Sequence, residues 1–364
     1  MGRERLVAEI ENFKSIGRLE LELGDVNVFF GPVASGKSNV LDALAFAGFF
    51  HRLKVYREEY EGRCCIEPLY NLARFCEPHQ LFRRYDASRA VRVRLESEGA
   101  VLECYVAYVG GAPKVTVNGE GVPLRESIFD VDEERAEEFR AEIPFESRLY
   151  SFDRYGRAAD PFSVAPLFKK DGPANVLSDF GWNPHVVVKK HARAVEKVNR
   201  ALRDLGLGLE VVVDGEGGFK LLDHGRAIEE EVGEGVPRLL YYLLALESLR
   251  SYAKIHGLKG ALALLEEPES HLYPRFLDVL ADEVVEASRD VVVCLTTYSP
   301  LLLERLYEGA RGSGVGLRAY YVHRSSEGST AARELDLRRA FEELVLFEEL
   351  MFGPPSFALT YAKA

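Results

Sequence analysis

The segment VNVFFGPVASGKSNVLDALAF, residues 26–46, carries the strongest signal in the sequence. Residues 31–38, GPVASGKS, fit the pattern G-x-x-x-x-G-K-[ST], between a predicted strand at 26–30 and a predicted helix that begins at Lys37. A glycine-rich turn in this position lets backbone N–H groups and the helix N-terminus face phosphate oxygens. The segment therefore predicts a phosphate-binding loop rather than a chance loop of glycine and serine.

Each part of this loop has an expected role. Gly31 and Gly36 allow the tight turn, Lys37 supplies a mobile cation to the β- and γ-phosphates, and the Ser38 hydroxyl can take one Mg²⁺ coordination position. The residues expected to hold a nucleotide are Gly31, Pro32, Ser35, Gly36, Lys37, Ser38 and Asn39.

A second motif is an acidic turn at the end of another predicted strand. Residues 261–265, ALALL, form a continuous apolar run suited to a buried parallel strand, and EEPE follows at 266–269. Carboxylates at the carboxyl end of such a strand suit one metal-facing and one water-facing acid. A surface acidic turn is the alternative, which the phosphate-binding loop in the same chain disfavours.

A third motif is TTYSP, residues 296–300, after the predicted strand VVVCL at 291–295. Its polar side chains would lie near the γ-phosphate if this strand neighbours the strand that ends at Glu266. An ordinary helix start, with Ser299 as the N-cap before Pro300, explains the segment equally well.

Composition limits the possible classes of protein. The 364 residues are 47% hydrophobic and 29% charged, which is typical of a soluble globular protein. With 46 basic and 58 acidic residues the net charge is −12, so a chain-wide attraction to nucleic acid or anionic membranes is not expected. No charge-free stretch of about 20 residues and no signal peptide are evident, which predicts a cytoplasmic protein without a membrane partner. The five cysteines lack C-x-x-C spacing, which argues against a zinc site.

Alternating helices and strands in the second half of the chain predict a parallel sheet covered by helices. The expected elements are helices at 236–255, 273–287 and 299–308 and strands at 261–265, 291–296 and 317–322. Period-two alternation predicts an antiparallel meander at 90–97, 100–109 and 113–119, and a hairpin at 209–213 and 219–222. A helix at 337–350 is expected to pack its apolar side chains on the rest of the chain.

Charged clusters have two possible interpretations. Residues 126–142 hold eight Asp or Glu and two Arg, and we expect a solvated helix face there. Two basic groups could contact DNA or be solvated faces: Arg83, Arg84, Arg89, Arg92 and Arg94 beside the meander, and Lys189, Lys190, His191 and Arg193 at the start of the helix that follows.

In this order the three motifs resemble those of the SMC/RecF/OLD-like ABC-type ATPases, also described as predicted AAA-type, RecF-like P-loop ATPases. The resemblance runs from about residue 5 to about 323. It rests on IENFKS at 10–15, SNVLDAL at 38–44, LEEPESHLYP at 265–274 and TTYSP at 296–300.

The resemblance implies an α/β fold, a P-loop NTPase with an ABC-type head. Its mixed sheet would have antiparallel N-terminal strands and a parallel core flanked by helices, with an inserted antiparallel β and helical lobe. The expected parts are N-terminal strands and P-loop at 1–50, the inserted lobe at 51–205, the second half of the head at 206–329, and a C-terminal helix and tail at 330–364.

The resemblance also implies site roles and partners. Glu266 and Ser38 would hold Mg²⁺, and Glu267 would be the general base, with Lys37 and Tyr298 also catalytic. In the family, ATP lies between two heads and the signature motif of one reaches the γ-phosphate on the other. VGEGVPR, residues 232–238, occupies the signature position, so its Gly235 and Arg238 would contact ATP in a homodimer.

Several positions depart from the family pattern. Gly233 replaces the signature serine, Tyr298 replaces the switch histidine, and Val33 and Ala34 stand where the family often has Asn-Gly. Gln80 precedes the meander, whereas a Q-loop should follow it, so Asp153 or Arg154 is the candidate for that role.

The favoured hypothesis is an ATP-binding head that dimerises around ATP and Mg²⁺ and hydrolyses ATP slowly, in DNA repair, genome maintenance or defence against mobile elements. The alternative is a non-catalytic, ATP-gated switch that controls a separate effector protein. A P-loop kinase acting on a small molecule is a third and weaker interpretation, because the EEPE turn suits water activation.

Overall fold

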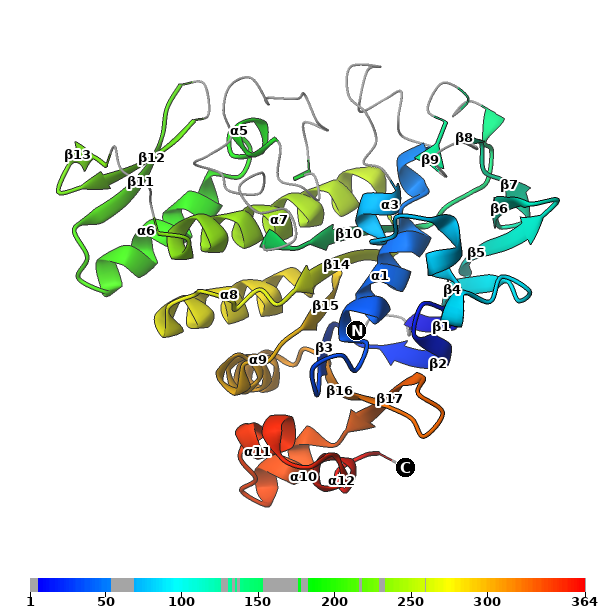
Figure 1. Ribbon diagram of the computed structural model, residues 1–364. Coiled ribbons are helices and arrows are strands. Elements are labelled where there is room, and N and C mark those ends of the chain that lie inside the picture. Colours follow the sequence, from blue (N-terminus) through cyan, green and yellow to red (C-terminus); the bar gives the residue numbers. More distant parts are fainter. Residues whose placement is uncertain are drawn as a thin grey trace.

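The computed structural model describes residues 6–53, 69–125, 130–132, 135, 138–152, 176–177, 183–215, 218–228, 233–258 and 260–363. Two six-stranded sheets and the helices between and around them make up most of this part of the chain (Figure 1).

The core sheet has the strand order β10-β14-β15-β3-β16-β17. Its strands are β10 (Phe145–Tyr150), β14 (Gly260–Glu266), β15 (Val292–Thr296), β3 (Val26–Phe30), β16 (Leu317–Arg324) and β17 (Thr330–Leu335). All neighbours pair in parallel except β17, which pairs antiparallel with β16. Continuous apolar sequences suit strands that are buried on both faces, and β3, β14 and β15 are buried throughout.

The second sheet is antiparallel, with the order β2-β1-β4-β5-β6-β7. Its strands are β1 (Leu6–Phe13), β2 (Ile16–Leu23), β4 (Val91–Ser97), β5 (Ala100–Val109), β6 (Ala112–Val117) and β7 (Glu120–Gly121), which confirms the predicted meander. Because β4 pairs with β1, the meander and the N-terminal strands form one sheet. Strand β10 pairs instead with β14 and belongs to the core sheet. Strand pairing thus crosses the expected boundary at residue 51, and the division into four parts stays a prediction.

Helix α1 (Lys37–Gly48) lies between the two sheets, where its buried side chains join one hydrophobic core with both sheets (Figure 1). The opposite face of the core sheet is covered by α7 (Gly235–His256), α8 (Pro274–Ala287) and α9 (Pro300–Ser313). The helices expected at 236–255, 273–287 and 299–308 are therefore confirmed. No helix in the described residues is long and apolar enough to cross a bilayer.

Shorter elements complete the middle of the chain. They are α3 (Leu69–Leu72), 3₁₀ turns at Pro78–Leu81 and Arg83–Tyr85, β8 (Leu124–Arg125), β9 (Asp130–Val131), α5 (Pro184–Val187), α6 (Ala192–Asp204), β11 (Leu209–Val213), β12 (Phe219–Asp223) and β13 (Arg226–Ala227). The predicted hairpin is confirmed as β11 and β12. Of the acidic segment 126–142, β9 is a strand rather than the expected helix face, and much of the rest lies outside the described residues. Lys189 and Lys190 lie in the turn between α5 and α6.

The C-terminal region differs from the single helix expected at 337–350. It contains α10 (Leu337–Glu342), α11 (Phe347–Phe352) and α12 (Pro355–Leu359). Leu344 separates the first two with a φ of 58°, a left-handed conformation that no α-helix contains. Phe347 and Leu350 are buried in the core, as expected, whereas Leu344 is 87% exposed.

Candidate functional site

The phosphate-binding loop connects β3 to α1 at the carboxyl edge of the core sheet, where ligands of open α/β sheets bind. Gly31 has a φ of 139°, and a Cβ there would come within 2.2 Å of the Val322 carbonyl oxygen. Gly36 has a φ of 104°, and its Cβ would lie 2.0 Å from Thr330 Oγ1. Glycine is required at both positions, because any side chain would be strained and would clash.

Lys37 folds its ammonium back into the loop. Its Nζ donates to the carbonyl oxygens of Gly31 (2.9 Å) and Pro32 (3.0 Å), and it lies 3.8 Å from the centroid of the Tyr298 ring. Burial lowers the pKa of Lys37 to about 8, although the charges of Glu267 and Glu269 oppose this shift. The structure thus brings Lys37 and Tyr298 into contact, with both carboxylates close enough to act on the ammonium.

The outer side of the loop is held by residues that sequence reasoning missed. Thr330 Oγ1 donates to the Ser35 carbonyl oxygen (3.0 Å) and lies 2.7 Å from Ser15 Oγ, which also accepts from Asn39 Nδ2 (2.6 Å). Arg324 Nε donates to the carbonyl oxygen of Ala34 (2.9 Å). The turn signal SSEGS at 325–329 could have revealed the β16–β17 hairpin that supplies Arg324 and Thr330.

The predicted metal ligand Glu266 is the last residue of β14 and is buried. Its Oε1 lies 3.3 Å from Arg74 Nη1, and Arg74 Nη2 lies 2.8 Å from Asp42 Oδ2, which also accepts from Lys14 Nζ (2.7 Å). Arg74 is a further residue that the sequence did not single out. A guanidinium therefore lies beside Glu266, the carboxylate predicted to hold Mg²⁺.

Glu267 follows in a left-handed conformation, with a φ of 44°. Its N–H contacts both the carbonyl oxygen and Oγ1 of Thr296, each at 3.2 Å, on the neighbouring strand β15. A non-glycine residue in this region of φ and ψ is strained, and the surrounding structure must hold it there. The residue predicted to be the general base therefore has a strained backbone. Burial raises the pKa of Tyr298, and the charge of Glu267 raises it further.

The switch segment lies beside this acidic turn, because β15 lies between β14 and β3 and pairs Thr296 with Glu266. Glu269 Oε1 accepts from Thr297 Oγ1 (2.7 Å) and from the N–H of Tyr298 (2.8 Å). Ser299 Oγ accepts from the N–H of Leu302 (3.1 Å), so the expected helix cap is also present.

The signature-like segment supplies the start of α7. A Cβ on Gly235 would lie 3.5 Å from the carbonyl oxygen of His271, in the segment that follows the acidic turn. Arg238 is fully buried: its Nη2 lies 3.2 Å from Glu234 Oε2, and its guanidinium lies 4.5 Å from the centroid of the Phe152 ring. To reach a phosphate on another molecule, Arg238 would have to leave Phe152, and its role stays a prediction. Val232, Asp153 and Arg154 lie outside the described residues.

Helix α7 also connects to the acidic turn. The Tyr242 hydroxyl lies 3.2 Å from the carbonyl oxygen of Glu266 and 3.2 Å from the N–H of Phe152, the last described residue after β10. One side chain of α7 therefore links the end of β14 with the segment in which the Q-loop was expected.

The residues present fit a magnesium nucleotide. Ser35 Oγ is buried in the loop without a hydrogen-bond partner among the described residues. Ser38, in the first turn of α1, and Glu266 offer the oxygen ligands that Mg²⁺ prefers.

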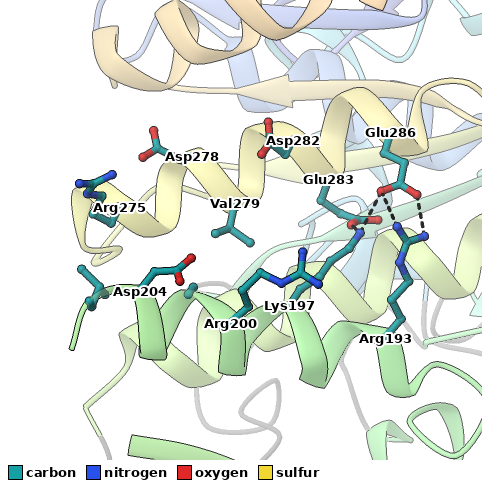
Figure 2. Close-up of a pocket in the computed structure, with 12 residues that line it drawn as sticks. Arg193, Lys197, Arg200, Asp204, Arg275, Asp278, Val279, Asp282, Glu283 and Glu286 are labelled. Atoms are coloured by element: carbon teal, nitrogen blue, oxygen red, sulfur yellow. Dashed lines mark hydrogen bonds and ion pairs between the residues drawn. The ribbon is translucent and has the colours of Figure 1, made fainter. Parts of the chain in front are cut away.

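A separate groove of about 630 Å³ lies between α6 and α8 (Figure 2). Lys197 contacts Glu283 and Glu286 there, and Arg193 Nη1 lies 2.7 Å from Glu286 Oε1. Burial raises the pKa of Glu283 to about 7. Burial acts in the same direction on Glu286, but the cations around it lower its pKa to about 2. The groove contains none of the residues predicted to hold the nucleotide or the metal, and its ion pairs connect the two helices.

Ion pairs also engage part of the basic group beside the meander. Arg92 Nε lies 2.5 Å from Glu103 Oε1, and Arg94 Nη2 lies 2.8 Å from Glu96 Oε2. Arg84 donates to the carbonyl oxygen of Glu327 (2.7 Å). These contacts support the interpretation of solvated or structural charges, and DNA contact stays a prediction.

The fold and motifs together define a class, the P-loop NTPases with an ABC-type head. Residues 189–304 match the family model described as "AAA domain, putative AbiEii toxin, Type IV TA system". A search of curated proteins finds no significant match.

Two solved structures are similar over nearly the whole chain. One is an SMC head bound to the C-terminal winged-helix domain of ScpA, with a TM-score of 0.53, 16% identity, and 94% of this chain and 100% of that chain covered. The other is the Smc head domain with an extended coiled coil bound to the C-terminal domain of ScpA, from Pyrococcus furiosus, with a TM-score of 0.50, 14% identity, and 94% and 98% covered. The chain has the fold of an SMC/RecF-like ABC-type P-loop ATPase.

Proposed function

We propose that this chain binds ATP with Mg²⁺, forms a homodimer around the nucleotide and hydrolyses ATP slowly, as the head of a machine for DNA repair, genome maintenance or defence against mobile elements. The observation that carries the proposal is the convergence at one sheet edge of the Lys37 ammonium, the Glu266 carboxylate and the strained residue Glu267.

Each residue would have a distinct task. Lys37 and the backbone N–H groups at the start of α1 would bind phosphate oxygens, and Ser38 and Glu266 would hold Mg²⁺. When bound, the Mg²⁺ neutralises charge on the transferred phosphoryl group. Glu267 would accept a proton from the attacking water, and Gly235 at the start of α7 would present N–H groups to the nucleotide on a second copy.

A non-catalytic, ATP-gated switch that controls a separate effector is the second candidate. The contact between Lys37 and Tyr298 favours it, because a tyrosine replaces the switch histidine of the family and a phenol is a poor acid or base near neutral pH. The matched family model, whose description names a toxin of a toxin–antitoxin system, supports a partner protein of that kind.

Mg²⁺-dependent phosphate release from ATP tests the proposal, in the wild type, Lys37→Ala and Glu267→Gln. We expect turnover in the wild type, loss of ATP binding in Lys37→Ala, and a fall of about 10²–10⁴-fold in turnover with retained binding in Glu267→Gln. Glu304→Gln, on the exposed side of α9, is the matched control for loss of a carboxylate.

The mass of the complex in solution separates the two candidates. An active head should form a stable dimer with ATP when hydrolysis is blocked by Glu267→Gln. ATP binding and dimerisation without phosphate release above the level of Glu267→Gln would instead support the switch. Absence of nucleotide binding in the wild type would refute both.

A further inference from the structure

The Lys37 ammonium is engaged by its own chain in this structure. A lysine ammonium has three N–H donors. Two of them reach the carbonyl oxygens of Gly31 and Pro32, and the centroid of the Tyr298 ring lies 3.8 Å from Nζ. The face of an aromatic ring attracts a cation, by about 0.5–2 kcal/mol depending on burial. The cation that should meet phosphate is therefore satisfied by its own chain.

The Tyr298 ring is held over Lys37 through the backbone of its own segment. Glu269 Oε1 accepts from the N–H of Tyr298 (2.8 Å) and from Thr297 Oγ1 (2.7 Å). Thr297 is fully buried, and its N–H donates to the carbonyl oxygen of Phe29 (3.1 Å). The other oxygen of this carboxylate, Glu269 Oε2, is buried without a hydrogen-bond partner in the described part of the chain. Glu269 therefore positions the switch segment through the two hydrogen bonds that its Oε1 accepts.

We infer that Tyr298 is an aromatic cover on Lys37, that Glu269 is the positioning residue that holds this cover in place, and that an incoming nucleotide must displace the ring from the ammonium. The inference rests on the proposed nucleotide site. Phosphate oxygens form charge-assisted hydrogen bonds with an ammonium, which are stronger than the contact with the ring. The exchange is then favourable, and the ring lowers nucleotide affinity by the energy of the contact that is lost.

A histidine at this position would act differently, because an imidazole can gain or lose a proton near neutral pH, whereas a phenol can only donate its O–H there. Burial and the nearby charges of Glu267 and Glu269 raise the pKa of Tyr298, so its phenol stays protonated and neutral near pH 7. In the free protein the face of the Tyr298 ring therefore contacts Lys37. When nucleotide is bound, position 298 provides a neutral phenol instead of an imidazole.

Calorimetric titration of the full chain with Mg·ADP and with a non-hydrolysable Mg·ATP analogue tests the exchange. Tyr298→Ala should bind both nucleotides about 2- to 30-fold more tightly than the wild type, which corresponds to the range of about 0.5–2 kcal/mol for the cation–π contact. Tyr298→Phe keeps the ring and should restore the wild-type affinity. Tyr105→Ala, which removes a half-exposed aromatic side chain from β5, is the matched control.

A double-mutant cycle tests the role of Glu269. Glu269→Ala should tighten nucleotide binding to the same extent as Tyr298→Ala and should add nothing in the Tyr298→Ala background, because both changes remove one contact. Glu269→Gln keeps an oxygen acceptor for the switch segment but removes the charge that acts on Lys37, so its change in affinity measures that charge and is subtracted from the effect of Glu269→Ala. Additive effects, or weaker binding in Tyr298→Ala than in the wild type, would overturn the inference.

Labelling of Lys37 by an amine-reactive reagent, read by mass spectrometry, checks the cover without nucleotide. Tyr298→Ala should raise the labelling rate of Lys37 several-fold and leave that of the exposed Lys254 unchanged. An equal rate in both proteins would refute the cover. If the wild type binds no nucleotide while labelling rises in the variant, the cover stands and the proposed function fails, along with the exchange.

Discussion

The β16–β17 hairpin contacts the phosphate-binding loop through Arg324 and Thr330, and Thr330→Val tests the second of these connections. Valine keeps the shape of the side chain and removes only the hydroxyl, which is buried. The Ser35 carbonyl oxygen then loses its donor at 3.0 Å, and Ser15 Oγ loses a partner at 2.7 Å but keeps Asn39.

The expected cost follows from these contacts. A buried carbonyl that loses its donor costs about 1–3 kcal/mol, and Ser15 keeps one partner, so we expect a loss of about 2 kcal/mol in the free energy of unfolding. An unfolding entropy of about 2.1 cal/mol/K per residue amounts to about 0.76 kcal/mol/K over 364 residues, so Tm should fall by about 3 °C. If half of that energy is lost from the binding-competent loop, nucleotide affinity should fall about fivefold.

Thermal unfolding followed by circular dichroism and calorimetric titration with Mg·ADP measure the two effects. Thr330→Ser keeps the hydroxyl and is the control: its affinity should remain that of the wild type, while its Tm falls only by the loss of a methyl group. If Thr330→Val retained both the Tm and the affinity of the wild type, the Thr330 hydroxyl would not be what holds the loop.

Three further predictions concern charged groups. Glu146 is fully buried, and Arg148 and His51 lower its pKa to about 2 against the effect of burial. Its stabilising contribution is therefore present above about pH 4.5 and is lost as the pH falls toward 2. Glu146→Gln should lower the free energy of unfolding, measured in urea, by about 3–5 kcal/mol, and a loss below about 1 kcal/mol would contradict this. Nucleotide affinity should be constant below the Lys37 pKa of about 8 and fall as the pH rises above it, whereas Lys37→Arg should show no such fall in titrations from pH 7 to 9.5. Arg74→Gln removes the cation beside Glu266, so nucleotide binding should reach half-saturation at a Mg²⁺ concentration a few-fold lower, and an unchanged requirement would show that Arg74 does not compete with the metal.

The parts of the fold that could be predicted are those that a local pattern encodes. Strands buried on both faces appear as continuous apolar runs, and the glycines of the loop are dictated by close approach of Val322 and Thr330. The sequence places TTYSP near the γ-phosphate only if the strand before it neighbours the strand of Glu266, and the pairing of Glu266 with Thr296 confirms this condition.

What could not be predicted depends on contacts between distant residues. Strand β17 has the sequence TAAREL, without a strong strand pattern, and its pairing with β16 brings Thr330 to Ser35 across 295 positions. Arg74 lies in an irregular segment with a φ of 46°, where neither a helical nor a strand periodicity in the sequence predicts the direction of its side chain. Burial of Arg238 against Phe152 likewise depends on the packing of α7.

The charged groups of the site each contact another part of the chain in this structure. Lys37 contacts two carbonyls and a ring, Glu266 lies beside the guanidinium of Arg74, and Glu269 holds the switch segment. Because Lys37 and Glu266 already have partners, nucleotide and metal would bind to them by exchange, and their affinities measure differences between internal and external contacts. The tyrosine at position 298, which departs from the family pattern, then affects the nucleotide-free site as much as it affects hydrolysis. Because ADP is not hydrolysed, the affinity for ADP measures the effect on the nucleotide-free site alone.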